Sequence, residues 1–150
     1  MAAVATTHNV SDDEVLADLL KQVAEEVAQV TADGAYDQRK CYAAIAERKA
    51  RAVIPPRRGA RLWHQDESTA EQSARNKNIR RISEVGRAQW KQESGYYQQG
   101  SAETAMFRLK TIFSGRLWGR SFEAQASEML VWCGALKGMT QLGMPDSYAA

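Results

Sequence analysis

The chain has 150 residues, of which 44% are hydrophobic and 25% are charged. This composition is typical of one globular domain. The sequence has no apolar run of about 20 residues, which a membrane-spanning helix needs. Its two cysteines lie far apart, which excludes a disulfide framework. The first ten residues lack the basic start and apolar middle of a signal peptide, so we expect a cytoplasmic protein in which Cys41 and Cys133 are reduced and partly buried.

The net charge of +2 is unevenly distributed along the chain. Residues 1–37 contain eight acidic residues and one lysine, whereas residues 38–91 contain fourteen Lys or Arg residues and five acidic ones. A basic stretch of this kind attracts polyanions such as nucleic acids, but a solvated helical face explains it equally well.

Residues 1–56 alternate between apolar runs of strand length and apolar residues at helical spacing. Ser11 and Glu14 have the spacing of a capping box, Asp37 is placed to cap a later helix, and the Pro55-Pro56 pair cannot continue a strand. The predicted elements are a strand at 2–7, a helix at 12–24, a strand at 27–31, a helix after Asp37 and a strand at 51–54. This order is typical of parallel βαβ units in an α/β fold whose sheet is covered on both faces.

The rest of the chain is predicted to be helical after a long basic loop at residues 57–73. Helical spacing predicts helices at 74–90, 101–117 and 122–142, and Gly143 is a stop signal for the last of them. The side chains predicted to be buried or half-buried in these helices are Trp90, Met106, Leu109, Ile112, Phe113, Trp118, Met129, Trp132 and Leu136.

Asp33 is the first candidate for chemistry, because it follows the predicted strand 27–31 directly. Ligands of open α/β sheets bind outside the carboxyl ends of the strands, and Gly34 gives the turn the freedom to present a carboxylate there.

Glu103 is the second candidate carboxylate, near the start of the predicted helix 101–117. In one continuous helix, Tyr96, Gln99, Glu103 and Lys110 would project within an arc of about 60°. Gly95 and Gly100 weaken the assumption of a continuous helix, but Glu103 and Lys110 share a face even in a helix that begins at Ser101.

Two acidic groups that meet beside a strand end can hold divalent metals through hard oxygen ligands, and a metal pair can activate water for in-line attack at phosphorus. A nearby lysine would neutralise phosphate charge. The alternative is structural: an Asp after a strand is commonly an Asx-turn residue, and a Glu near a helix start favours the helix dipole.

Trp63 lies in the basic loop beside Arg57, Arg58 and Arg61. It could stack on a splayed base, but anchoring of the loop is the favoured interpretation. His8 and His64 lack any metal-ligand spacing and are predicted to be surface or capping residues.

Three stretches carry a resemblance to a known family. They are TADGAYDQRKCYAAIAERKARAVIPPRRGARLW, RNKNIRRISEVGRAQWKQESGYYQQGSAETAMFRLKTIFSGRL and the tail LGMPDSYAA. Together they resemble the C-terminal half of bacterial insertion-sequence transposases of the IS-five type, which belong to the DDE class and have an RNase H-like catalytic domain.

The resemblance implies that Asp33 matches the second catalytic aspartate and Glu103 the catalytic glutamate, both as Mg²⁺ ligands. Tyr96 and Lys110 match two further signature positions, and the lysine is expected to contact transposon-end DNA. Gln99 departs from the pattern, because the family has an arginine there and an amide cannot replace its bidentate phosphate contact. The predicted DNA-binding residues are therefore Lys110, Tyr96, Gln99, Arg57, Arg58 and Arg61.

A second departure concerns the first catalytic aspartate of the family, which precedes the region that resembles residues 1–10. The resemblance thus implies a truncated catalytic domain over residues 1–150, a partial RNase H-like fold whose first strands are missing. It consists of a βαβαβ portion at 1–56, the basic loop at 57–73 and a helical portion at 74–150 that carries Glu103. Asp33 and Glu103 alone are expected to bind Mg²⁺ weakly.

The function implied by the resemblance is DNA-mediated transposition of an insertion sequence, by metal-dependent strand cleavage and strand transfer, with this chain inactive on its own. Its expected partners are transposon-end and target DNA, a full-length transposase or a second copy of the chain. Two alternatives remain at this stage: a non-enzymatic DNA-binding protein that interferes with a full-length transposase, and a decayed gene product.

Overall fold

The computed structural model describes residues 2–7, 9–63 and 70–143, so the predictions for His8, His64 and the tail after Gly143 lie outside the described residues. The chain divides into two compact units. The first, here the sheet unit, consists of Val10–Ser101 with Ala2. The second, here the helical unit, consists of Ala3–Asn9 and Ala102–Ala150.

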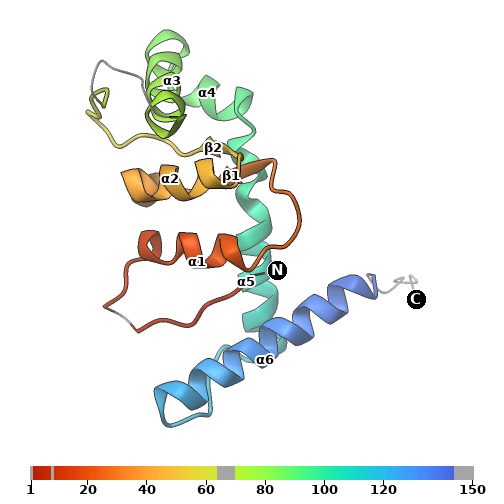
Figure 1. The fold of residues 1–150 in the computed structure, drawn as a ribbon. Coiled ribbons are helices and arrows are strands. Elements are labelled where there is room, and N and C mark those ends of the chain that lie inside the picture. The colour runs from red at the N-terminus through yellow and green to blue at the C-terminus, as the bar shows by residue number, and fades with distance from the viewer. Residues whose placement is uncertain (1, 8, 64–69, 144–150) are drawn as a thin grey trace, which may run out of the picture. The chain divides into compact units, whose positions relative to one another are not determined.

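The sheet unit is built around two short parallel strands, β1 (Gln29–Thr31) and β2 (Arg51–Val53), joined through α2 (Arg39–Glu47). Val30 is opposite Ala52 in the register. The predicted parallel βαβ unit is therefore confirmed at this place (Figure 1). The fold is a helix-rich mixture of α and β structure, and the sheet has two strands among the described residues.

The prediction of a strand at residues 2–7 was wrong, since the described part of this segment has no strand pairing. Half of these six residues are alanines, which are depleted in strands because they have little side chain to pack on a pleated surface.

The first predicted helix is shorter than residues 12–24. It consists of a 3-10 turn, η1 (Asp12–Glu14), followed by α1 (Leu16–Lys21). The predicted capping box was also wrong: the Ser11 hydroxyl bonds to the carboxylate of Asp13 and caps no backbone N–H.

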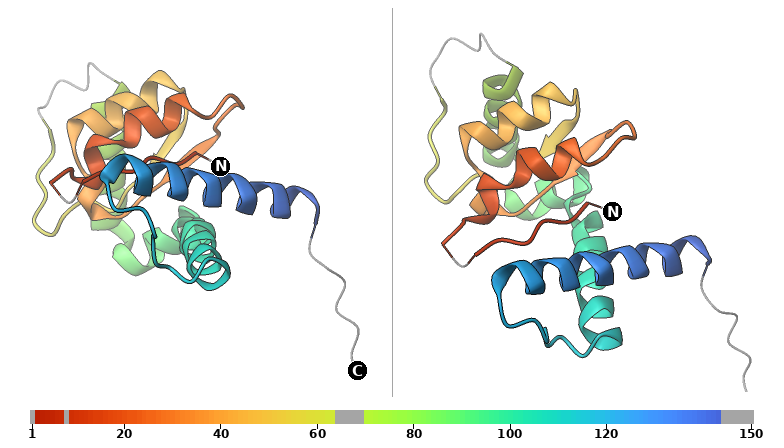
Figure 2. Two further views of the ribbon diagram at one scale, coloured as in Figure 1. Left: turned by 90° about the horizontal axis from the view of Figure 1, so that it is seen from below. Right: turned by 60° about the horizontal axis from the view of Figure 1, so that its bottom comes forward.

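The core of the sheet unit lies where α1 and α2 pack side by side and where α2 covers the strands (Figures 1 and 2). The buried side chains come from both helices, from β2 and from the residues that directly follow the two strands: Leu16, Leu20, Ala32, Cys41, Tyr42, Ala44, Ile45, Ala52 and Ile54. Cys41 and Cys133 are both free thiols, as predicted, and burial raises the pKa of each.

The predicted helix 74–90 is two helices, α3 (Ala70–Val85) and α4 (Arg87–Glu93), which are separated at Gly86. Gly86 has a φ of 83°, a conformation that glycine adopts without the steric cost a Cβ would bring. Trp90 of α4 is buried, as predicted.

The helical unit contains most of α5 (Gly100–Ile112) and all of α6 (Phe122–Gln141). Leu109 and Leu136 are buried as predicted, and Phe113 stacks on Trp132 with the ring centroids 5.2 Å apart. Met106, Ile112 and Trp118 are exposed, contrary to the prediction. No helix among the described residues is long and apolar enough to span a membrane.

Candidate functional site

Asp33 follows β1 directly and is exposed at the carboxyl end of the parallel strand pair, as the sequence predicted. It is the N-cap of the 3-10 turn η2 (Gly34–Tyr36), and its Oδ1 accepts a hydrogen bond of 2.8 Å from the N–H of Ala35. This is the Asx-type turn of the structural interpretation, and it also holds the carboxylate in one orientation.

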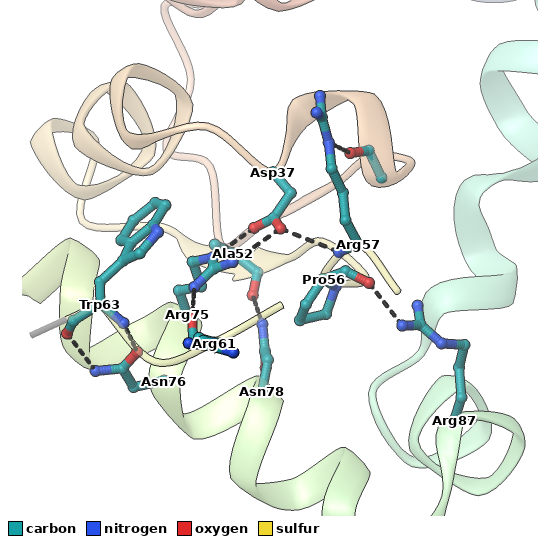
Figure 3. Close-up of polar contacts among 11 residues, drawn as sticks. Asp37, Ala52, Pro56, Arg57, Arg61, Trp63, Arg75, Asn76, Asn78 and Arg87 are labelled. Carbon is teal, nitrogen blue, oxygen red and sulfur yellow. Dashed lines mark hydrogen bonds and ion pairs between the residues drawn. The ribbon is translucent and has the colours of Figure 1, made fainter. Parts of the chain in front are cut away.

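The turn at Asp33 lies against the segment that follows β2. A Cβ on Gly34 would come within 3.3 Å of the carbonyl oxygen of Pro55, which is a tight contact, so glycine allows the two chain segments to approach. The Arg57 side chain donates from Nε to the Gly34 carbonyl, and Arg87 donates to the Pro56 carbonyl at 2.6 Å (Figure 3). The Arg57 side chain thus joins the segment after β2 to the turn after β1, and Arg87 joins that segment to α4.

Asp37 does not cap α2, so that prediction was wrong, and Gln38 occupies the N-cap position without a side-chain hydrogen bond. The Asp37 carboxylate is buried, and it accepts hydrogen bonds from Arg75 at 2.6 Å and 3.1 Å, one on each oxygen (Figure 3). It also accepts the backbone N–H of Arg57 at 3.1 Å. A bidentate arginine and a backbone donor satisfy the charge that a buried carboxylate carries.

The described part of the basic loop, residues 57–63, is anchored at three points to this ion pair and to α3. Arg57 N–H donates to Asp37, and the Arg61 carbonyl accepts from Arg75 Nη1 at 2.8 Å. The backbone N–H and C=O of Trp63 form a reciprocal pair with the buried side chain of Asn76, at 3.0 Å and 3.1 Å. The side chains of Arg57, Arg58 and Arg61 are exposed on this anchored backbone.

Trp63 anchors the loop, which was the favoured interpretation. Its ring meets Tyr42 edge-on with the centroids 5.4 Å apart, and the Arg75 guanidinium lies 4.2 Å from its centroid. The ring is therefore already engaged by an aromatic and a cationic neighbour.

Two tyrosines near the Asp33 turn have raised pKa values. Burial raises the pKa of Tyr36, and the carboxylates of Asp12 and Asp33 raise it further. Burial also raises the pKa of Tyr42, with the Asp37 carboxylate adding to the effect. Both phenols stay protonated at neutral pH.

Tyr96 and Lys110 do not lie in one continuous helix, and the helix that was predicted to begin at Ser101 begins one residue earlier. Tyr96 and Gln99 lie in a 3-10 turn, η3 (Tyr96–Gln99), and α5 begins at Gly100. Tyr96 is half-buried, with the Lys91 ammonium 4.5 Å from its ring centroid. Glu103 and Lys110 are both exposed in α5, and their spacing of seven residues places them on one face.

The fit of these residues to a divalent cation is partial. Carboxylate oxygens are the donors that Mg²⁺ prefers, and both Asp33 and Glu103 are exposed. Within the described residues, no three His, Cys, Asp or Glu side chains are grouped so that they could hold a metal ion. Asp33 belongs to the sheet unit and Glu103 to the helical unit.

Sequence reasoning missed the Asp37–Arg75 pair and the role of Asn76. The two members of the ion pair are 38 residues apart, and neither position has a local pattern that distinguishes a buried ion pair from a surface charge. The only hint in the sequence was the basic stretch itself, which shows that cations are present but not which carboxylate each of them binds.

A comparison with protein families gives one match over most of the chain. The family model of the transposase DDE domain matches residues 1–136. No solved structure matches the chain. This family acts on DNA in transposition. The chain belongs to the transposase DDE domain family.

Proposed function

We propose that residues 1–150 form part of the catalytic domain of an insertion-sequence transposase of the IS-five type, with an RNase H-like fold, in which Asp33 and Glu103 are metal ligands. The observation that carries the proposal is the position of Asp33, exposed and hydrogen-bonded at the joined carboxyl ends of two parallel strands in a chain of this family. Ligands of α/β sheets bind at such ends.

Each residue then has a separate role. Asp33 would hold Mg²⁺, with its carboxylate orientation fixed by the Ala35 N–H, and Glu103 would supply a second hard ligand. Bound Mg²⁺ would polarise a DNA phosphate and lower the pKa of the attacking water. Lys110 would contact a DNA phosphate from the same helix face as Glu103, with Tyr96 and Gln99 as supporting residues, and Arg57, Arg58 and Arg61 would hold the DNA backbone.

The resemblance gives the family three catalytic carboxylates, and we assign two of them within residues 1–150. We propose that a protein of these 150 residues alone does not cleave DNA, because a metal site with two carboxylates lacks the ligand that the DDE class adds. Purified protein should therefore release no product from transposon-end DNA in Mg²⁺. Cleavage that disappears in Asp33→Ala would contradict this part of the proposal.

A chimera tests the two assigned carboxylates directly. Residues 1–150 would be joined to the segment of a related transposase that carries the first aspartate, and strand cleavage would be measured with Mg²⁺. Asp33→Asn and Glu103→Gln should each lower the rate about a thousandfold or more, since a lost metal ligand removes several kcal/mol of transition-state stabilisation.

Two substitutions serve as matched controls in the same chimera. Asp18→Asn removes an exposed aspartate of α1, and Glu123→Gln removes an exposed glutamate from the first turn of α6. Neither should change the rate more than a few-fold. If Glu123→Gln and Glu103→Gln have the same effect, the assignment of Glu103 is wrong.

A non-enzymatic DNA-binding role is the second candidate function, in which the chain pairs with a full-length transposase and interferes with it. It is supported by three exposed arginine side chains on a loop whose backbone is fixed by Asp37, Arg75 and Asn76. A rigid loop loses little conformational freedom when its side chains meet phosphates.

A further inference from the structure

The sheet unit contains an open groove of about 650 Å³ beside β2, and its lining includes neither Asp33 nor the arginines of the basic loop. It is lined by residues of β2, α3 and α4, among them Arg51, Lys77, Asn78, Arg81 and Glu93. Three of these side chains are cationic and one is anionic, so the groove has a net positive charge.

The backbone of β2 contributes to this groove. Arg51 N–H donates to the Ala28 carbonyl, and Val53 C=O accepts from Ala32, so the polar groups of residues 51 and 53 point toward β1. Because these directions alternate along a strand, the N–H and C=O of Ala52 point to the outer edge. The Asn78 amide of α3 donates to the Ala52 carbonyl at 3.3 Å (Figure 3), which agrees with that direction.

The cations of the groove differ in their partners. Arg81 forms a bidentate pair with Glu93, at 2.9 Å and 3.0 Å, and also bonds to Glu84 at 3.1 Å. Hydrogen bonds from Gln89 and Arg81 lower the pKa of Glu93, so this carboxylate is ionised at neutral pH. Arg51 and Lys77 are exposed and have no ion-pair partner among the residues that the structure describes.

We propose that this groove binds a phosphate of a DNA strand, with Arg51 and Lys77 as the primary contacts and Glu93 as an internal counter-charge that weakens the binding. The proposal rests on the proposed function for the identity of the ligand. The groove supplies what a phosphodiester needs: two exposed cations on facing elements, an amide edge, and a third cation, Arg81, whose partner a phosphate oxygen can replace.

Two pairs of matched variants test the proposal, with a fluorescent DNA oligonucleotide, duplex or single-stranded, as the probe and the intact 150-residue chain as the protein. Glu93→Gln should strengthen binding about fivefold, since a like charge beside a phosphate costs about 1 kcal/mol in a solvated site. Glu84→Gln removes the other carboxylate bound to Arg81 but does not line the groove, so it should leave affinity unchanged. Lys77→Gln should weaken binding about fivefold, whereas Arg80→Gln, an exposed cation on the same helix outside the groove, should not.

Each result decides the question. A larger effect of Glu93→Gln than of Glu84→Gln, together with a larger effect of Lys77→Gln than of Arg80→Gln, supports the groove. Equal effects within either pair, or no DNA binding by the wild-type chain at low salt, would overturn it. Arg51→Gln repeats the cation test from β2 if Lys77→Gln lowers the melting temperature. If the groove variants behave as expected but Asp33→Asn and Glu103→Gln leave cleavage by the chimera unchanged, the catalytic assignment alone is refuted.

Discussion

Arg75 makes contacts that hold several parts of the sheet unit together. Its guanidinium binds both oxygens of the buried Asp37 carboxylate, donates to the Arg61 carbonyl and lies against the Trp63 ring. Asp37 in turn accepts the Arg57 N–H beside the Asp33 turn. Arg57 also donates from its side chain to the Gly34 carbonyl, so the turn that carries Asp33 is connected to the buried Asp37–Arg75 ion pair through Arg57.

Arg75→Met should lower the free energy of unfolding by about 3–5 kcal/mol, because it leaves the Asp37 carboxylate buried without its cation. Urea unfolding followed by circular dichroism would measure the change. The double variant Asp37→Asn with Arg75→Met should lose less than the sum of the two single variants, since removal of both charges leaves no buried unpaired ion.

Arg81→Met is the control for this prediction. Arg81 also bonds to a carboxylate through two nitrogens, but its side chain is 48% exposed, so water replaces the lost partner. It should change the free energy of unfolding far less than Arg75→Met. If both variants lose the same free energy of unfolding, the buried Asp37–Arg75 pair stabilises the protein no more than the exposed Arg81–Glu93 pair does.

The elements show where sequence patterns were sufficient. The carboxyl end of β1, the parallel partner at β2 and the stop at Pro55 and Pro56 followed from short apolar runs and from the missing N–H of proline. Asp33 was located for the same reason. The split at Gly86 was not predicted, because a glycine in a helical pattern is usually tolerated, and the sequence does not show that this one has a positive φ.

Tertiary contacts decided what the local patterns could not. Ser11 and Asp37 are both of a residue type that commonly caps helices, yet the Ser11 hydroxyl bonds to Asp13 and the Asp37 carboxylate accepts hydrogen bonds from Arg75. Met106 and Ile112 are apolar at helical spacing, yet they are exposed. The prediction failed because spacing alone does not show which part of a helix another element covers.

Alanine substitutions at two glycines of the helical unit should change the stability in opposite directions. Gly134 lies within α6, and a Cβ there would meet no atom within 4 Å. Gly134→Ala should stabilise the protein by about 0.5–1 kcal/mol, because alanine loses less conformational entropy in a helix. A Cβ on Gly119 would lie 2.7 Å from the backbone nitrogen of Gln125, so Gly119→Ala should destabilise it by about 1–3 kcal/mol.

The cost at Gly119 arises from the start of α6. Trp118 and Gly119 both donate their N–H groups to Glu128, and Gln125 donates to the Gly119 carbonyl at 2.9 Å. Thermal unfolding of the two variants would measure both changes. A stabilising Gly119→Ala would contradict the close packing of this loop on α6.

At the scale of the whole chain, the uneven charge distribution has two structural parts. The acidic residues 1–37 include Asp13, whose hydrogen bond from Lys40 lowers its pKa, and the buried Asp37. The basic residues 38–91 include both the anchored loop and the groove cations Arg51 and Lys77. Part of the acidic charge is thus paired with the basic stretch, while much of the exposed cationic charge is open to a polyanion.

The salt dependence of DNA binding distinguishes a defined loop contact from a general attraction by this charge. The triple variant Arg57→Gln, Arg58→Gln and Arg61→Gln should lower the slope of log affinity against log salt by about 2–3, because each lost phosphate contact removes about 0.9. The control triple Arg108→Gln, Arg116→Gln and Arg120→Gln removes the same charge outside residues 38–91 and should change the slope by less than about 1. Fluorescence anisotropy over a series of salt concentrations would measure both slopes. If the two triples change the slope equally, the loop binds no phosphates of its own, and only the net charge of the chain attracts DNA.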